Sequence, residues 1–478
     1  MHYEPSWESL RNHRTPQWLQ DSKFGIYAHW GIYSVPACGP NTTWYGYNMY
    51  REGTEQYDHH VRTYGRPSVF GYKDFIPMFT GEKFDAGQWA ECFGRAGAKF
   101  AGPVAEHHDG FAMWDSALSP WNAARMGPKR NVVAELERAI RRQGLRFMAA
   151  LHHAENWWYF PHRKGYDTLD PRYSGLYGQR RNDANESGLA APVLERPTRA
   201  FLDRWKGKII EVIDGFRPDL LWFDFGLGGI QEQYKKEFLA YYYNKGDEWA
   251  TEVAVTHKYH DLPPGVAIVD LELGSMEELA YHDWITDTTI DDGEAWGYMH
   301  NARYKSAARL VHYLVDNVSK NGYLLLNVGP KPNGEIPRPA LEVLRGIGRW
   351  LEVNGEAIFA TTPWLTFGEG PTRMKKSGAF SEREETHYTG RDIRFTCRGN
   401  TLYATCLGVP QGPMTVASLK SLYPAEIQSV VMLGCDRELT WSQTPDALVI
   451  RPPADAAWRP ASGCEHACVF RITTKAPF

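Results

Sequence analysis

Short apolar runs alternate with longer segments of helical periodicity over residues 1–350. Repeated strand–helix units with apolar strands indicate a parallel sheet that is covered on both faces. Seven or eight such units favour an α/β (β/α)8 TIM-like barrel over an open sheet. The predicted strands are 24–29, 100–106, 145–152, 220–225, 252–256, 266–271 and 323–328, with a weaker eighth near 283–288. The predicted helices are 86–98, 131–144, 197–215, 231–244 and 303–321.

The pattern changes after Trp364, where short alternating segments replace the strand–helix units. The segments are IRFTCRG, TLYATCLG, SVVMLGC, ALVIRPP and ACVFRIT, with turn residues between them. Alternation with no helical periodicity predicts a C-terminal antiparallel β-sandwich. We therefore expect a catalytic barrel over 1–358 and a sandwich over 359–478, whose expected role is to brace the barrel.

Composition narrows the function classes. The net charge is −4, with 53 basic and 57 acidic residues, which argues against a basic nucleic-acid surface. Aromatic residues make up 14% of the chain and include 18 tryptophans, and such rings suit the faces of sugars as well as protein cores.

Cysteine usage and the N-terminus bear on the compartment. The seven cysteines are odd in number and sparse, so free thiols in a reducing compartment are expected. The N-terminus shows no basic start followed by an apolar run, and no apolar stretch reaches transmembrane length. A cytoplasmic location without membrane partners is favoured, unless a leader has been removed.

Five predicted strands end in ionisable residues. Barrel enzymes carry their active sites at the C-terminal ends of the strands. Turn chemistry explains one such ending but is a poor explanation of five together. The endings are His29, Glu106-His107-His108-Asp109, His152-His153-Ala154-Glu155, Asp224 and Asp270-Leu271-Glu272.

Asp224 follows the continuously apolar run LLWF, which is typical of a buried strand. A carboxylate at the end of such a strand costs desolvation free energy unless hydrogen-bond donors or a function compensate for it. Histidines converging on the same barrel mouth could supply those donors. A carboxylate held ionised beside an apolar wall fits a nucleophile.

Cleavage of an acetal also needs an acid to protonate the leaving oxygen. Glu272 is the preferred candidate, because it lies nearer the strand end than Asp270, its local rival. Glu294 is a second rival on a loop. Histidines such as His152 and His153 could also bind a metal, but the HxH pair typical of metal-dependent barrel hydrolases is missing from the first strand, so no metal or other cofactor is expected.

Several segments together resemble one family, the α-L-fucosidases of glycoside hydrolase family 29. The resemblance covers nearly the whole chain, barrel and sandwich together. The matching segments are KFGIYAHWGIYSVP, WYGYNMY, EHHDGFAMWDS, GPKRNVVAEL, PDLLWFDFG, EAWGYM and LVDNVSKNGYLLLNVGPKPNGEIP.

The resemblance implies a retaining exo-glycosidase that removes terminal α-L-fucose from fucosylated oligosaccharides or glycoconjugates. The family nucleophile corresponds to Asp224, and the acid/base, whose position varies in the family, is expected at Glu272. The sugar-binding residues that match the family are His29, His107, His108 and Trp222. Trp222, Trp44 and Trp296 are candidates to face the C6 methyl group of fucose. The oligomeric state stays open, with a homo-oligomer as one option.

Three departures from the family pattern concern the pocket. His152 stands where many relatives have a tyrosine that contacts the sugar, and residues 41–43 lack the carboxylate expected before Trp44. Leu273 replaces an arginine expected beside the acid/base. Two alternatives stay open: a metal-dependent barrel hydrolase that uses the histidines, and, because of the change at Leu273, a sugar-binding protein whose active site has decayed.

Overall fold

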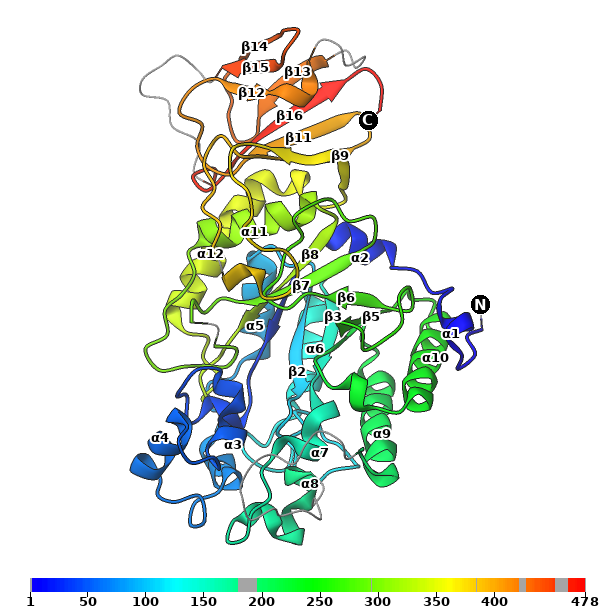
Figure 1. The fold of residues 1–478 in the computed structure, drawn as a ribbon, viewed down its shortest axis with the longest axis vertical. Coiled ribbons are helices and arrows are strands. Elements are labelled where there is room, and N and C mark those ends of the chain that lie inside the picture. The colour runs from blue at the N-terminus through cyan, green and yellow to red at the C-terminus, as the bar shows by residue number, and fades with distance from the viewer. Residues whose placement is uncertain are drawn as a thin grey trace.

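The computed structural model describes residues 2–178, 196–293, 295–383, 385–420, 427–451 and 463–477. They form a closed parallel barrel followed by two antiparallel sheets (Figure 1). Both parts of the predicted fold class are confirmed.

The barrel contains eight strands in sequence order, and pairing of β1 with β8 closes it. The strands are β1 (Phe24–Ala28), β2 (Phe100–Glu106), β3 (Arg146–Leu151), β4 (Leu220–Phe223), β5 (Ala254–Lys258), β6 (Ile268–Asp270), β7 (Trp284–Thr289) and β8 (Gly322–Val328). Each matches a predicted strand, including the weak one, but β5 ends two residues later than expected. The two extra residues bring Lys258 into the strand, which matters for the site.

Within the described residues, six longer helices accompany the barrel, and the pattern of α6 shows why they form. Its buried residues recur at helical spacing from Val132 to Ile140, so one face of the helix packs against the barrel. The side chain of Asn131 caps its N-terminus by accepting a hydrogen bond from the amide of Ala134. These helices are α5 (Ala86–Arg95), α6 (Val132–Arg142), α9 (Arg199–Phe216), α10 (Glu232–Glu248), α11 (Ala307–Ser319) and α12 (Arg338–Asn354).

The helical layer is incomplete on one side. Residues 259–267 and 271–283, all within the described chain, contain no helix, so β5, β6 and β7 are joined by loops. Two short helices precede the first strand, α1 (Trp7–Leu10) and α2 (Gln17–Ser22). Others lie in the connections after β1 and β3: α3 (Tyr45–Asn48), α4 (Glu55–Thr63), α7 (Asn156–Tyr159) and α8 (Ser174–Tyr177).

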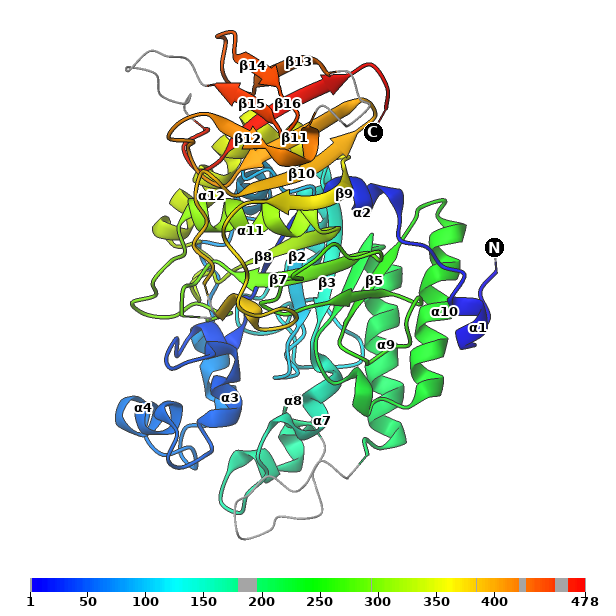
Figure 2. The ribbon, with the colours of Figure 1, turned by 45° about the horizontal axis from the view of Figure 1, so that its top comes forward.

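The C-terminal part has a five-stranded sheet in the order β13-β16-β11-β10-β9 and a three-stranded sheet in the order β12-β15-β14. Its strands are β9 (Thr362–Glu369), β10 (Ile393–Arg398), β11 (Thr401–Cys406), β12 (Met414–Val416), β13 (Ile427–Met432), β14 (Thr440–Gln443), β15 (Leu448–Arg451) and β16 (Cys468–Thr474). This part caps one end of the molecule, with β9 and β10 next to α11 (Figure 2). The expected division after residue 358 stays a prediction.

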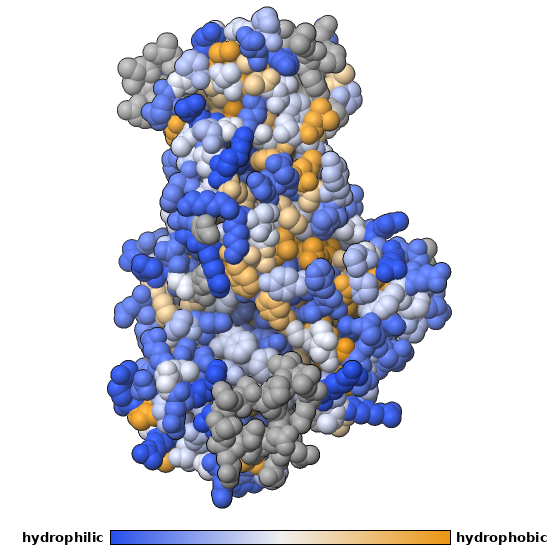
Figure 3. Space-filling model, viewed as in Figure 1, coloured by the Kyte–Doolittle hydropathy of each residue, from blue (hydrophilic) through white to orange (hydrophobic). Residues whose placement is uncertain are grey.

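The visible surface is mostly hydrophilic at its edges, and hydrophobic side chains gather in the middle of this face (Figure 3). Among the described helices, none is both long enough and apolar enough to cross a bilayer.

Candidate active site

One pocket of about 600 Å³ lies at the C-terminal ends of the barrel strands. It gathers all nine of the predicted site residues: His29, Trp44, His107, His108, His152, Trp222, Asp224, Glu272 and Trp296. Glu155, from the ionisable ending of the third predicted strand, lines it too. It also includes polar and aromatic residues that the sequence did not single out, namely Tyr27, Phe225, Asp287, Phe380 and Arg383.

Asp224 directly follows β4 and faces two histidines. Its Oδ2 atom lies 3.3 Å from Nε2 of His108 and 3.8 Å from Nε2 of His152. Burial alone would raise the pKa of Asp224, but the hydrogen bond and charge of His108 and the charge of Lys258 bring it below its ordinary value. Asp224 is therefore ionised at neutral pH.

His108 is the cation that compensates Asp224. Its Nδ1 atom donates to the carbonyl oxygen of His152 at 2.8 Å, while Nε2 faces the carboxylate, so both ring nitrogens carry protons. Glu155 adds a second carboxylate, with Oε2 3.6 Å from Nδ1. Although burial opposes the charged form, the hydrogen bond with Asp224 and the two negative charges raise the pKa of His108.

The other three pocket histidines are neutral. Burial lowers the pKa of His29 to about 4, and it lowers the pKa values of His107 and His152 well below the ordinary value. Nδ1 of His29 donates to the amide oxygen of Asn327 at 2.8 Å, so its Nε2 atom, which lies 3.2 Å from Nε2 of His152, carries no proton. Neutral imidazoles can exchange hydrogen bonds with sugar hydroxyls or bind a metal, and these three each offer a nitrogen within 4.8 Å of the others.

Aromatic rings line the same pocket. The ring of Trp222 lies 5.1 Å from that of His152, that of Trp296 lies 5.5 Å from His29, and that of Trp44 lies 5.3 Å from His108, measured between centroids. The Nε1 atom of Trp222 donates to Oδ2 of Asp270 at 2.9 Å, which fixes the plane of the indole. Flat apolar surfaces therefore alternate with hydrogen-bonding groups around the pocket, as in binding sites for small polar ligands.

A buried lysine organises the carboxylates on the opposite side. The Nζ atom of Lys258, at the end of β5, lies 2.8 Å from Oδ1 of Asp270, 2.6 Å from Oδ1 of Asp287 and 3.5 Å from Oε2 of Glu272. The hydroxyl of Tyr27 donates to the other oxygen of Asp287 at 2.8 Å. The single ammonium of Lys258 thus forms ion-pair contacts with three carboxyl groups.

Lys258, which three carboxyl groups share, does not keep the pKa of Glu272 low. Burial raises the pKa of Glu272 to about 8, the charges of Asp287 and Asp224 act in the same direction, and Lys258 opposes them only in part. The pocket therefore pairs an ionised carboxylate with a carboxylic acid at neutral pH.

Other ionisable residues that the sequence raised as candidates do not line this pocket or are outside the described residues. Asp270 is buried behind the pocket wall, where it binds Lys258 and Trp222, and it does not line the pocket. His153 points away, with Nε2 3.2 Å from the carbonyl oxygen of Trp205. Asp109 forms a turn, accepting from the amide of Phe111. Glu294 lies outside the described residues.

Comparisons with known proteins agree across the chain. The alpha-L-fucosidase family model matches residues 1–356, and that of the alpha-L-fucosidase C-terminal domain matches 386–473. The tissue alpha-L-fucosidase of Rattus norvegicus is 30% identical over 492 residues, which cover 96% of this chain and 92% of that protein. The human plasma alpha-L-fucosidase is 34% identical over 378 residues, 76% of this chain and 73% of that protein.

Solved structures show the same likeness. The Thermotoga maritima alpha-fucosidase in complex with fucose superposes with a TM-score of 0.75 at 30% identity, covering 99% of this chain and 100% of that one.

Lys258→Met should destabilise the protein strongly. Removing the ammonium leaves buried carboxylates uncompensated, and we expect the free energy of unfolding at pH 7 to fall by about 3–5 kcal/mol. Burial and Asp287 already hold the pKa of Asp270 well above its ordinary value. The loss should therefore shrink as the pH falls toward about 4, where protonated carboxyl groups need no cation. Urea unfolding across this pH range measures both effects.

The matched control is Lys83→Met, which breaks an exposed ion pair with Glu335. It should change the free energy of unfolding by less than about 1 kcal/mol. Equal losses in the two variants would contradict the charge-sharing arrangement.

Proposed function

Because this chain belongs to the alpha-L-fucosidases of glycoside hydrolase family 29, an enzyme family that hydrolyses fucosides, we propose that it cleaves terminal α-L-fucosides with retention of configuration. Asp224 is the proposed nucleophile and Glu272 the proposed acid/base. The observation that supports these roles is the pair of opposite pKa shifts in one pocket, lowered at Asp224 and raised to about 8 at Glu272. Two carboxyl groups whose environments push their pKa values apart are the signature of a nucleophile and an acid.

In the first step, a carboxylate oxygen of Asp224 attacks the anomeric carbon of fucose as the bond to the leaving oxygen breaks. Glu272 gives its proton to that oxygen, so the leaving group departs as a neutral alcohol and the fucose is held as an ester of Asp224. In the second step, Glu272 takes a proton from water, and the water oxygen attacks the same carbon. Two inversions give net retention, and both carboxyl groups return to their initial states.

The histidines have two proposed roles. Charged His108 holds the carboxylate of Asp224 in place through the 3.3 Å contact and keeps it ionised. Neutral His29, His107 and His152 bind the hydroxyls of fucose. In relatives with tyrosine at position 152, an O–H group replaces the imidazole, so this chain makes a different contact there.

The tryptophans supply the proposed apolar wall. Fucose carries a methyl group at C6, and the rings of Trp44, Trp222 and Trp296 on the pocket wall suit that group better than a hydroxymethyl. The proposed substrate is a fucosylated oligosaccharide or glycoconjugate, and the proposed reaction uses no cofactor.

The cluster of His29, His107 and His152 favours one rival function, a metal-dependent hydrolase. Zinc or manganese measured at one equivalent per chain, with activity lost on chelation and restored by the metal, would support that rival. We expect elemental analysis of the active enzyme to give well below one equivalent, and chelators to leave fucoside hydrolysis intact.

Replacement of the nucleophile should abolish turnover. Asp224→Gly is expected to lower kcat/KM for an aryl α-L-fucoside by at least about 10³-fold, or ~4 kcal/mol of transition-state stabilisation. Azide fits the space that the side chain leaves and should restore turnover, with β-L-fucosyl azide as the product because a single displacement inverts the anomeric carbon. NMR of the product checks the configuration, and near-normal activity without azide would rule out the assignment.

Leaving-group dependence should identify the acid/base among Glu272, Asp270 and Glu294. Glu272→Gln should keep activity on a dinitrophenyl fucoside, whose leaving group needs no proton, and lose it on an alkyl fucoside. Asp270→Asn and Glu294→Gln should affect both substrates equally. If one of those two variants shows the selective loss instead, the acid/base is that residue.

The same residue should set the alkaline limb of the pH profile. With a pKa of about 8, Glu272 keeps its proton below that pH and loses it above, so kcat/KM for the wild type should fall about tenfold per pH unit beyond pH 8. The limb should vanish in Glu272→Gln, which has no proton to lose.

A further inference from the structure

The connection between β9 and β10, residues 370–392, returns from the C-terminal sheets to the barrel mouth. Residues 357–385 lie outside both family-model matches, so most of this connection is not covered by either. Two of its side chains, Phe380 and Arg383, nevertheless line the same pocket as the carboxyl groups of the proposed mechanism.

The connection pairs with the backbone segment that carries Glu272. The amide of Phe380 donates to the carbonyl oxygen of Glu272 at 2.7 Å, and that of Glu382 donates to the carbonyl oxygen of Leu273 at 2.8 Å. Ser275 and Gly378 exchange two further backbone hydrogen bonds. On its other edge, the segment donates from Leu273 to the carbonyl oxygen of Asp287 in β7 at 2.8 Å. Glu272 is thus held between a barrel strand and the connection.

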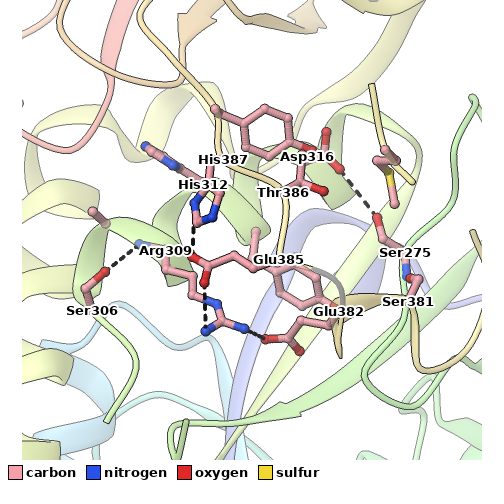
Figure 4. A pocket seen from close by; sticks show the side chains of 14 residues that line it. Ser275, Ser306, Arg309, His312, Asp316, Ser381, Glu382, Glu385, Thr386 and His387 are labelled. Carbon is pink, nitrogen blue, oxygen red and sulfur yellow. Dashed lines mark hydrogen bonds and ion pairs between the residues drawn. The ribbon is translucent and has the colours of Figure 1, made fainter. Parts of the chain in front are cut away.

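Charged contacts fix the connection to the barrel wall. Glu382 lies 2.5 Å from Nζ of Lys305 and 3.6 Å from the guanidinium of Arg309 on α11. Arg309 also reaches Glu385, 3.4 Å away, so one arginine holds two points of the connection (Figure 4). Lys305 and Glu382 are nearly buried, and such a pair holds its partners in a defined position.

The inward side of the connection has chemistry suited to a sugar. The guanidinium carbon of Arg383 lies 4.6 Å from the centroid of the Phe380 ring, so the cation stacks on the aromatic face. Nearby, the ring of Phe225 lies 5.1 Å from that of Tyr259. An aromatic ring can cover the apolar face of a pyranose, and a guanidinium donates hydrogen bonds to hydroxyl oxygens.

The position of Glu272 indicates which of the two sugars of the substrate would contact Phe380 and Arg383. The acid/base of a glycosidase contacts the oxygen between the cleaved sugar and the leaving group. Side chains that flank Glu272 at the pocket wall therefore face the leaving group, whereas the histidines around Asp224 face the fucose.

We propose that Phe380 and Arg383 form the binding site for the leaving-group sugar, a pyranose released with a free hydroxyl, and that the β9–β10 connection thereby determines which fucosylated glycans are cleaved. This inference rests on the proposed function, because it takes Glu272 as the acid/base.

The test compares a substrate that has a sugar leaving group with one that has none. The two probes are α-L-fucosyl fluoride and whichever of fucosyl-(1→2)-galactose and fucosyl-(1→3)-N-acetylglucosamine the wild type cleaves faster. In Arg383→Ala and in Phe380→Leu, the ratio of kcat/KM for the disaccharide to kcat/KM for the fluoride should fall about tenfold or more. Arg383 is exposed, so its variant is expected to fold normally.

Arg373→Ala is the matched control, since Arg373 is an exposed arginine of the same connection that does not line the pocket. Its ratio should equal that of the wild type. A ratio unchanged within about twofold in both Arg383→Ala and Phe380→Leu would overturn the inference. Failure of the wild type to hydrolyse fucosyl fluoride would instead refute the proposed function itself, so the two failures are distinguishable.

Discussion

The site depends on a single buried ammonium, that of Lys258. Taking charges out of water is costly, and a buried carboxylate persists only where a cation or hydrogen-bond donors compensate it. Lys258 compensates Asp270 and Asp287 at short range and Glu272 at 3.5 Å.

Each of those contacts positions something else. Asp270 fixes the indole of Trp222, and Asp287 accepts from Tyr27. Burial raises the pKa of Glu272, and Lys258, whose charge two other carboxyl groups share, opposes that rise only in part. On the other side of the pocket, Asp224 stays charged because His108, which Glu155 also approaches, and Lys258 lower its pKa. Burial acts to raise both pKa values, and the contrast arises because His108 outweighs it at Asp224 whereas Lys258 does not at Glu272.

Much of this arrangement could be predicted from the chain. The barrel strands are apolar runs with clear ends, and the parallel topology brings their C-terminal ends together, so polar residues at five strand ends had to share one mouth. That geometry brings His29, His108 and Asp224 into one pocket, although nearly 200 residues separate the first from the last. The roles of those residues in catalysis stay proposals.

Residues that the sequence did not single out lack a comparable local signal. Lys258 lies two residues beyond the end of the predicted strand, because the histidine and lysine that follow Thr256 break the pattern on which that prediction depended. Asp287 lies in the weakest predicted strand, where a run of polar residues follows the two apolar residues Trp284 and Ile285. Phe380 and Arg383 belong to a connection with no periodicity, and only the folded chain brings it back to the barrel.

The β9–β10 connection also bears on how such enzymes diversify. The C-terminal sheets lie at one end of the molecule (Figure 1). From that position, replacing the C-terminal region with that of a relative would be expected to leave the pocket unchanged. The exchanged piece would nevertheless carry Phe380 and Arg383, together with the backbone that pairs with Glu272. A recombination event downstream of the barrel would thus replace part of the pocket wall while leaving both carboxyl groups untouched, so selectivity could evolve separately from the catalytic chemistry.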